Sequence, residues 1–132
     1  MKDVTQFIYD ETFKLCLRFT DKVYRSLPGE VGYPFIYLGE QFDQPTETRD
    51  LLLSVGTTQI AIHLYGLAGK RKQTTDLMRD LKMSLRFLHS DQYSVSGVTA
   101  NILQENPNNT EPLIHGILTV NFSYYQDERK KK

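Results

Sequence analysis

The fold of this chain is best read outward from one stretch, Tyr33-Pro34-Phe35-Ile36-Tyr37-Leu38-Gly39-Glu40. Tyr, Phe and Ile are frequent in β-strands, and Gly32 and Gly39 bracket the run, so the stretch predicts a short strand. Pro34 lacks an N–H group and is tolerated at the first residue of a strand. Because neither face of the run is polar, we expect helices before and after it to cover both faces.

The composition is that of an ordinary globular domain. The chain has 132 residues, 39% hydrophobic and 24% charged, so we expect one domain with a modest core. The 16 basic side chains balance 16 acidic ones, which gives the chain no overall attraction to nucleic acid or membranes. A single cysteine, Cys16, excludes an intrachain disulfide and a cysteine-built metal site. We find no signal peptide and no apolar run of roughly 20 residues, and expect a soluble protein.

Two helices and four strands are predicted. Apolar residues at spacings of four and seven indicate helices, and strict alternation indicates strands. The predicted helices cover residues 3–27 and 70–89, and the predicted strands cover residues 33–40, 51–65, 93–104 and 113–125. The first helix has a possible break near residues 19–21, after which a second short helix could begin. Gly56 and Gly97 are candidate β-bulges.

The order α-β-β-α-β-β predicts an α+β sandwich, a four-stranded sheet covered by two helices. The strands that flank the second helix should be parallel. One domain is expected over residues 1–125, followed by a disordered basic tail at residues 126–132. Two long polar segments, residues 41–50 and 105–112, are predicted as exposed loops at opposite ends of the sheet.

Few residues suggest catalysis. His63 and His115 lie on outward strand faces and could pair as metal ligands or as acid and base. No further acidic or cysteine ligand stands at a suitable spacing, so we favour two histidines on a polar face. Cys16 lies within the first helix and is interpreted as a structural thiol. With no phosphate loop and no nucleophile motif, we predict that the chain is not an enzyme and uses no metal or cofactor.

The basic cluster Lys70, Arg71 and Lys72 opens the second helix, which is the unfavourable end for cations. A solvated face or an acidic neighbouring subunit is the favoured interpretation. A nucleic-acid-binding domain is the weaker alternative, because no aromatic residues interleave with the cluster and the net charge is zero.

Two motifs resemble a known family. Val23-Tyr24-Arg25-Ser26-Leu27-Pro28 fits the pattern V-Y-x-x-x-P, and the opening stretch fits Y-P-[FY]-[IV]-x-[LI]-G-E. Together they resemble the tail terminator proteins of long-tailed bacteriophages, which are also described as tail-completion or head–tail joining proteins. The later elements follow a similar order, so the resemblance covers nearly the whole chain. A related minor capsid or neck (head-completion) protein would look similar.

The resemblance implies a structural role in virion assembly. Such proteins form a ring, usually hexameric, on the last ring of the tail tube. They stop tube growth and present a surface to the head connector, while DNA passes through the lumen. The implied partners are further copies of the chain, the tail tube protein and the head connector, with possible contact to lumen DNA and none to a membrane. Assembly would take place in the host bacterial cytoplasm, and the location would be the virion.

On this basis we expect the two polar loops to make the axial contacts of the ring. The basic cluster would face an adjacent subunit or lumen DNA. The candidate axial residues are Gln41, Phe42, Asp43, Gln44, Glu47, Arg49, Asp50, Glu105, Asn106, Asn108, Asn109 and Glu111.

Overall fold

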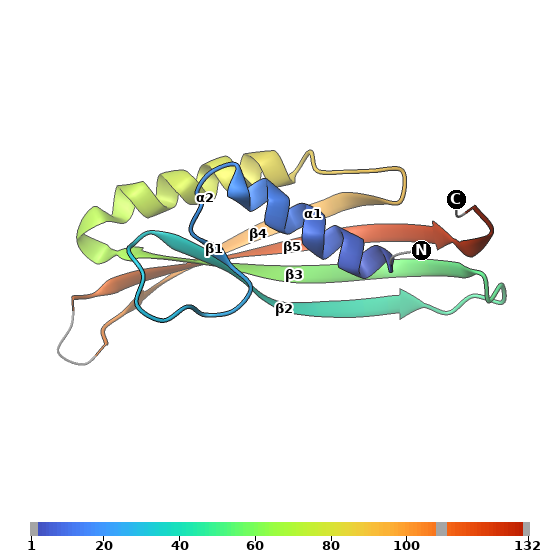
Figure 1. Ribbon diagram of the computed structural model, residues 1–132, viewed down its shortest axis with the longest axis horizontal. Coiled ribbons are helices and arrows are strands. Elements are labelled where there is room, and N and C mark those ends of the chain that lie inside the picture. Colours follow the sequence, from blue (N-terminus) through green and yellow to red (C-terminus); the bar gives the residue numbers. More distant parts are fainter. Residues whose placement is uncertain (1–2, 108–110, 131–132) are drawn as a thin grey trace.

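The computed structural model describes residues 3–107 and 111–130 and shows a long sheet with both helices above it (Figure 1). The helices are α1 (Val4–Leu17) and α2 (Arg71–Leu85), and the strands are β1 (Val23–Tyr24), β2 (Phe35–Thr46), β3 (Leu53–Leu67), β4 (Tyr93–Glu105) and β5 (Leu113–Asp127). Short 3-10 helices, Ala68–Lys70 and Glu128–Lys130, precede α2 and follow β5. This order confirms the predicted α+β class.

The sheet has five strands in the order β1-β2-β3-β5-β4, so the prediction of four strands is wrong. The additional strand, β1, pairs in parallel with β2 and places Val23 opposite Ile36. The sequence pattern predicts helix here, but α1 ends at Leu17. The carbonyl of Lys22 then accepts a hydrogen bond of 2.9 Å from the N–H of Ile36. The chain therefore breaks near residues 19–21 and continues as a strand instead of a second helix.

A long antiparallel pair forms the centre of the sheet. β3 and β5 pair over their full lengths, from Leu53 opposite Asp127 to Leu67 opposite Leu113. Each strand has 15 residues, so at about 3.3 Å per residue the pair is roughly 45 Å long. β4 is also antiparallel to β5, which makes β3 and β4 parallel as predicted.

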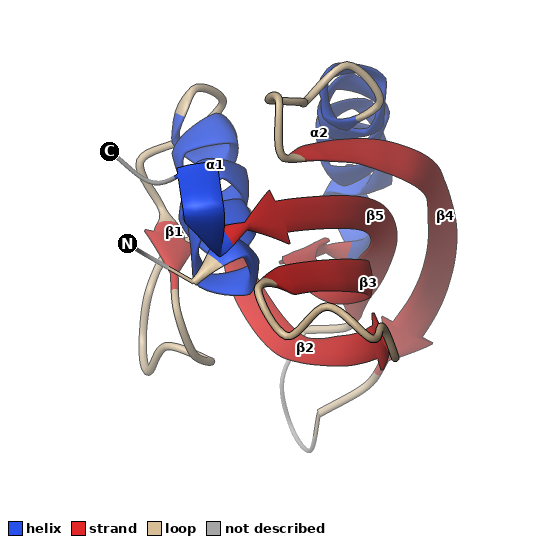
Figure 2. Cartoon of the chain, turned by 90° about the vertical axis from the view of Figure 1, so that its right-hand side faces the viewer, coloured by secondary structure: helices blue, strands red, loops and turns tan. Residues whose placement is uncertain are grey.

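Both helices pack against the same face of the sheet (Figure 2), and the hydrophobic core lies between them and the strands. Alternate residues of β3 and β5 point toward the helices, as their alternating pattern predicts. The fully buried side chains of this layer include Ile8 and Leu15 of α1, Leu81 and Leu85 of α2, Ile60, Ile62 and Leu64 of β3, and Leu118, Val120 and Phe122 of β5. Within residues 3–107 and 111–130, no helix covers the opposite face, which we call the open face.

Two glycines let α2 approach the sheet closely. A Cβ atom at Gly66 of β3 would overlap Thr74 Oγ1, and one at Gly116 of β5 would overlap Met78 Sδ. Thr74 and Met78 are both buried residues of α2. The missing side chains at these two strand positions therefore set the distance between α2 and the sheet.

The segment predicted as an exposed connection, residues 41–50, is half strand. β2 continues to Thr46, and only residues 47–52 remain as the β2–β3 turn. Gln41 is bonded into the layer between helix and sheet, where its Nε2 donates to Thr58 Oγ1 at 3.1 Å. The prediction of a loop is wrong for residues 41–46. The sequence alone does not show whether a polar side chain bonds to another part of the fold or to solvent.

Of the two predicted bulges, one is present. The register shifts between Val95 and Gly97, which confirms the bulge at Gly97. The bulge predicted at Gly56 is wrong, because β3 pairs with β5 without interruption. A further bulge lies in β2 between Leu38 and Gln41, where the sequence pattern gives no sign of it.

The prediction of a disordered tail at residues 126–132 is wrong for its first part. β5 extends to Asp127, and Gln126 Oε1 accepts a hydrogen bond of 3.3 Å from the N–H of Val4. Arg129 pairs with Asp50 at 2.8 Å and so joins the C-terminal segment to the β2–β3 turn. The last part of the predicted tail, residues 131–132, lies outside the described residues.

Candidate functional site

The β2–β3 turn and the β4–β5 loop lie at opposite ends of the central strand pair, as predicted (Figure 1). The turn, residues 47–52, adjoins Leu53, and the loop, residues 106–112, adjoins Leu113 at the other end of the same ladder. The molecule therefore has two separated ends, each formed by a connection between strands.

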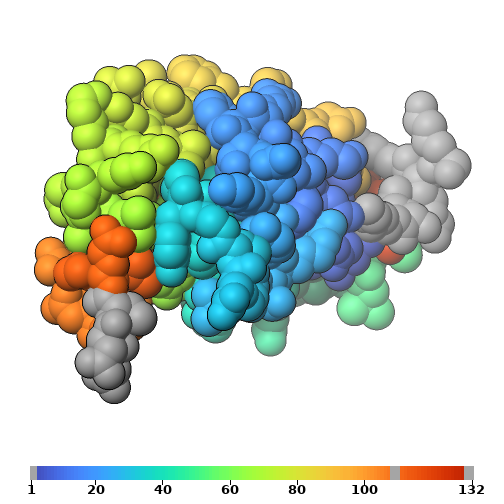
Figure 3. All heavy atoms as spheres, turned by 60° about the vertical axis from the view of Figure 1, so that its left-hand side comes forward, coloured from blue at the N-terminus to red at the C-terminus, as the bar shows by residue number. Residues whose placement is uncertain are grey.

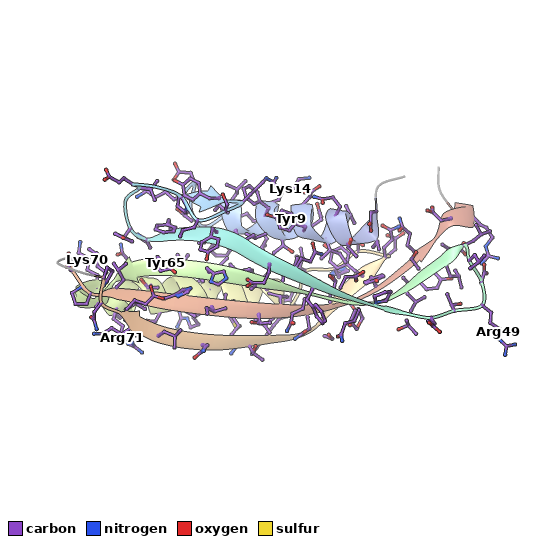
Figure 4. All side chains as sticks on the ribbon, turned by 90° about the horizontal axis from the view of Figure 1, so that it is seen from below. Tyr9, Lys14, Arg49, Tyr65, Lys70 and Arg71 are labelled. Atoms are coloured by element: carbon purple, nitrogen blue, oxygen red, sulfur yellow. The ribbon has the colours of Figure 1, made fainter. Side chains whose placement is uncertain are left out.

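The structure places the candidate axial residues in different settings. Gln41, Phe42, Asp43 and Gln44 belong to strand β2. The turn contains Glu47, Arg49 and Asp50, and Figure 4 shows Arg49 at the far end of the molecule. Glu105 ends β4, and Asn106 and Glu111 are exposed in the β4–β5 loop. Asn108 and Asn109 lie outside the described residues.

The β2–β3 turn carries an apolar pair that the sequence pattern does not reveal. Leu51 is 94% exposed and Leu52 is 45% exposed, although the alternating pattern assigns both to a strand. Asp50 shapes the turn, because its Oδ1 accepts the N–H of Leu52 at 3.0 Å and its Oδ2 pairs with Arg129 at 2.8 Å. Two adjacent leucines at this turn therefore form an exposed apolar surface.

The basic cluster lies at the end of the molecule that carries the β4–β5 loop. The N–H of Ala68 donates to the carbonyl of Pro112 at 3.0 Å, which joins the start of α2 to this loop. Figure 3 shows this end from outside, and Figure 4 shows Lys70 and Arg71 at its margin. Lys72 pairs with Asp76 at 2.7 Å, and this contact lowers the pKa of the Asp76 carboxyl. Lys70 and Arg71 are exposed, so their positive charges lie on the outer surface.

The two histidines that the sequence places on outward faces meet on the open face. Nδ1 of His63 lies 2.8 Å from Nε2 of His115. Nε2 of His63 lies 3.2 Å from Glu40 Oε1, and Nδ1 of His115 lies 2.8 Å from Glu105 Oε2. These four side chains, from β2, β3, β5 and β4, form what we call the Glu–His–His–Glu chain.

Aromatic rings shelter the two imidazoles. Tyr37 stacks on His63 with ring centroids 4.5 Å apart, and Tyr65 stacks on His115 at 4.2 Å. The side chains of His63 and His115 are only 12% and 10% exposed as a result. Burial, and then the charge of Glu105, raise the pKa of Tyr65 to about 12. Figure 4, which views the molecule from below, labels Tyr65 among the side chains of the sheet.

The four side chains are arranged in a line and do not surround a common point, as the ligands of a metal ion would. Successive ring nitrogens bond to different partners, so the four side chains do not converge on one point. Among the residues that the structure describes, no group of three or more His, Cys, Asp or Glu could hold a metal ion.

Cys16 is buried, and burial raises the pKa of its thiol to about 12, so the thiol stays protonated at neutral pH.

The two edges of the sheet differ in how well they are covered. Within the described part of the chain, β1 pairs with Ile36 and Tyr37 of β2, and no strand pairs with the rest of that edge of β2. β4 forms the other edge over 13 residues. A groove of about 210 Å³ lies between β4 and α2 and is lined by Thr75, Met78, Arg79, Lys82, Ala100, Ile102 and Leu118.

Neither described helix is long and apolar enough to cross a lipid bilayer.

Sequence comparison with protein families and with curated proteins finds no match. Among solved structures, the chain is similar to a chain in the virion of a native gene transfer agent particle, with a TM-score of 0.54 and 11% sequence identity. The alignment covers 83% of this chain and 84% of that chain. At this identity the likeness shows that the two chains share a fold.

Proposed function

We propose that this chain is a structural protein of a phage-type virion and that it works without catalysis. Its fold is shared with a chain from the virion of a gene transfer agent particle, which supports this role. The single observation that carries the proposal is the long β3–β5 pair with a connection at each end. This arrangement gives one subunit two contact surfaces roughly 45 Å apart, as a protein between two different assemblies requires.

In its finer form, the proposal is a tail terminator. Copies of the chain form a hexameric ring on the last ring of the tail tube, where they stop tube polymerisation and receive the head connector. The β2–β3 turn contributes Glu47, Arg49 and the exposed Leu51 to one axial surface. The β4–β5 loop, with Asn106 and Glu111, contributes to the other. The two motifs that resemble the tail terminator family support this form over a general virion role.

The edges of the sheet are the proposed contacts between neighbouring subunits. An edge strand presents N–H and C=O groups that can pair with another chain. The free part of β2 and the full length of β4 are such edges. The basic cluster and the basic residues further along α2 would then face acidic groups of an adjacent subunit or DNA in the lumen. Six basic and two acidic side chains lie between residues 70 and 86, which supports a partner of negative charge.

The test is removal of the gene from a phage that carries it, followed by electron microscopy of lysates. A tail terminator predicts filled heads that lack tails, together with separate tails of abnormal length. A neck or head-completion protein, the alternative with the same geometry, predicts separate tails of normal length. Heads joined to tails of normal length would exclude both assignments. A wild-type gene supplied in trans should restore joined particles.

A further inference from the structure

The Glu–His–His–Glu chain is the feature of this structure that the assembly role leaves unused. It crosses the four long strands in one line, from Glu40 of β2 through His63 and His115 to Glu105 of β4. The successive contacts measure 3.2, 2.8 and 2.8 Å. Side chains joined end to end in this way tie the strands together across the open face, in addition to the backbone ladder.

The number of protons on the two imidazoles follows from these contacts. An ionised carboxylate only accepts hydrogen bonds, so Nε2 of His63 and Nδ1 of His115 must each carry a proton. The central contact of 2.8 Å needs one N–H and one lone pair, because two N–H groups at that distance repel. The complete chain therefore holds three protons on four ring nitrogens. The pair then carries one positive charge between two carboxylates.

The surroundings of the pair support this charge state. A backbone hydrogen bond, and then the contact with His63, lower the pKa of the Glu40 carboxyl. Burial raises the phenol pKa values of Tyr37 and Tyr65, so both stacked rings stay neutral. The residues paired with the two histidines in the neighbouring strands are Tyr37, Ile117, Tyr65 and Leu103, none of which is charged at neutral pH. Glu40 and Glu105 therefore supply the charges that face the pair.

We propose that the Glu–His–His–Glu chain is an acid-sensitive latch, closed with three protons on the histidine pair and opened at the His63–His115 contact by a fourth. The latch does not depend on the proposed assembly role. Glu105 is the last residue of β4 and stands directly before the β4–β5 loop. Opening the latch removes the side-chain tie between the base of this loop and strands β2 and β3, so that the backbone ladder alone holds the base.

Nitrogen-15 NMR of the imidazole rings in the intact chain counts these protons. Near pH 7 we expect three protonated nitrogens and one unprotonated nitrogen in the pair, with the fourth proton entering in more acidic solution. His89 is the internal reference, because it is exposed and its Nδ1 lies 2.9 Å from the carbonyl of Phe87, outside the latch. Two protonated nitrogens in the pair near pH 7, or titration curves that match that of His89, would overturn the latch.

Amide hydrogen exchange tests whether the latch holds the loop. When the fourth proton enters, we expect exchange at residues 103–105 and 113–115 to become roughly tenfold faster after correction for intrinsic rates. Residues 53–58 of the same sheet, at the opposite end, should keep their rates and serve as the reference. Unchanged exchange at the loop base would show that the pair does not act as a latch.

The variant Glu105→Gln separates the charge of the carboxylate from the fold. Glu105 is 41% exposed, so the variant should fold. Without this charge, we expect the pair to hold two protons near pH 7 and the loop base to exchange faster at that pH. Glu111→Gln is the matched control, because Glu111 is an exposed residue of the same loop outside the latch. Three protons retained in Glu105→Gln would contradict the proposal.

Discussion

Tyr124 of β5 donates a hydrogen bond of 2.9 Å from its hydroxyl to Asp43 Oδ1 of β2, although β3 separates the two strands. The contact passes over Gly56, where a Cβ atom would lie 2.8 Å from the Tyr124 hydroxyl and 2.6 Å from the carbonyl of Gln44. The glycine that the sequence suggests as a bulge therefore has a different purpose. It leaves room for a side chain that joins the strands on either side.

The first prediction concerns this contact. Tyr124→Phe should lower the free energy of unfolding by about 1 kcal/mol, because one hydrogen bond to an exposed carboxylate is lost. Urea denaturation at neutral pH measures the change. Tyr125→Phe is the matched control, since Tyr125 is 44% exposed on the other face of β5. Equal stability of Tyr124→Phe and the wild type would mean that the contact contributes nothing.

A second prediction concerns alkaline pH. Burial is the main cause that raises the pKa values of Tyr65, Tyr93 and Tyr124 to about 12. An unfolded tyrosine ionises near pH 10, so between about pH 10 and pH 12 the unfolded chain loses these protons while the folded chain keeps them. The contribution of these three tyrosines to stability should be constant below about pH 10 and fall as the pH rises toward 12. Urea midpoints measured across this range check the slope, which should be smaller in Tyr124→Phe.

The sequence predicts the main elements of this fold because most of them bury one face. The stripes of α2 and the alternation in β3 and β5 report directly on the helix-facing layer, which holds Leu81, Ile62 and Leu118 at zero exposure. The failures occur where polar residues have partners inside the fold. Residues 41–46 and 126–127 look like loop and tail, but the side chains of Gln41, Asp43 and Gln126 bond to distant parts of the chain. The strand β1 is missed because two residues are too few to form a pattern.

The candidate site is predictable to a similar degree. The two-residue period of the strands is enough to predict that His63 and His115 lie on the same face of the sheet. That they are neighbours can be predicted only from the register of the β3–β5 pair. Glu40 reaches His63 through the bulge between Leu38 and Gln41, which no sequence pattern announces. A chain of four groups from four strands therefore needs the sheet order before it can be recognised.

A third prediction concerns the packing of α2 against the sheet. Gly66→Ala should destabilise the fold by about 1–3 kcal/mol, because its Cβ overlaps the buried Thr74 Oγ1. That oxygen has no hydrogen-bond partner among the described residues, so Thr74→Ala removes the overlap without breaking a bond. The double variant Gly66→Ala with Thr74→Ala should recover most of the loss in thermal unfolding. Gly29→Ala is the control, because nothing lies within 4 Å of the Cβ position there.

A fourth prediction tests the axial surface at the β2–β3 turn. Leu51→Asp should leave the melting temperature unchanged, because the side chain is 94% exposed, and should reduce the yield of joined particles at least tenfold. Complementation of the gene deletion with the variant measures that yield. Leu27→Asp, at a residue 60% exposed elsewhere on the surface, is the control and should complement fully. Full complementation by Leu51→Asp would remove this turn from the axial contacts.

The last prediction concerns the basic cluster. Reversing the charge of Lys70 and Arg71 to Glu should leave the folded monomer intact, since both side chains are exposed. It should weaken ring formation or head–tail joining by roughly tenfold if the cluster faces an acidic partner, and the loss should shrink as salt rises. Sedimentation velocity at low and high salt measures ring formation, and complementation measures joining. Arg18→Glu reverses an exposed charge next to α1 and is the control. If the double reversal forms rings and joins particles as well as the wild type, the cluster is a solvated surface that contacts no acidic partner.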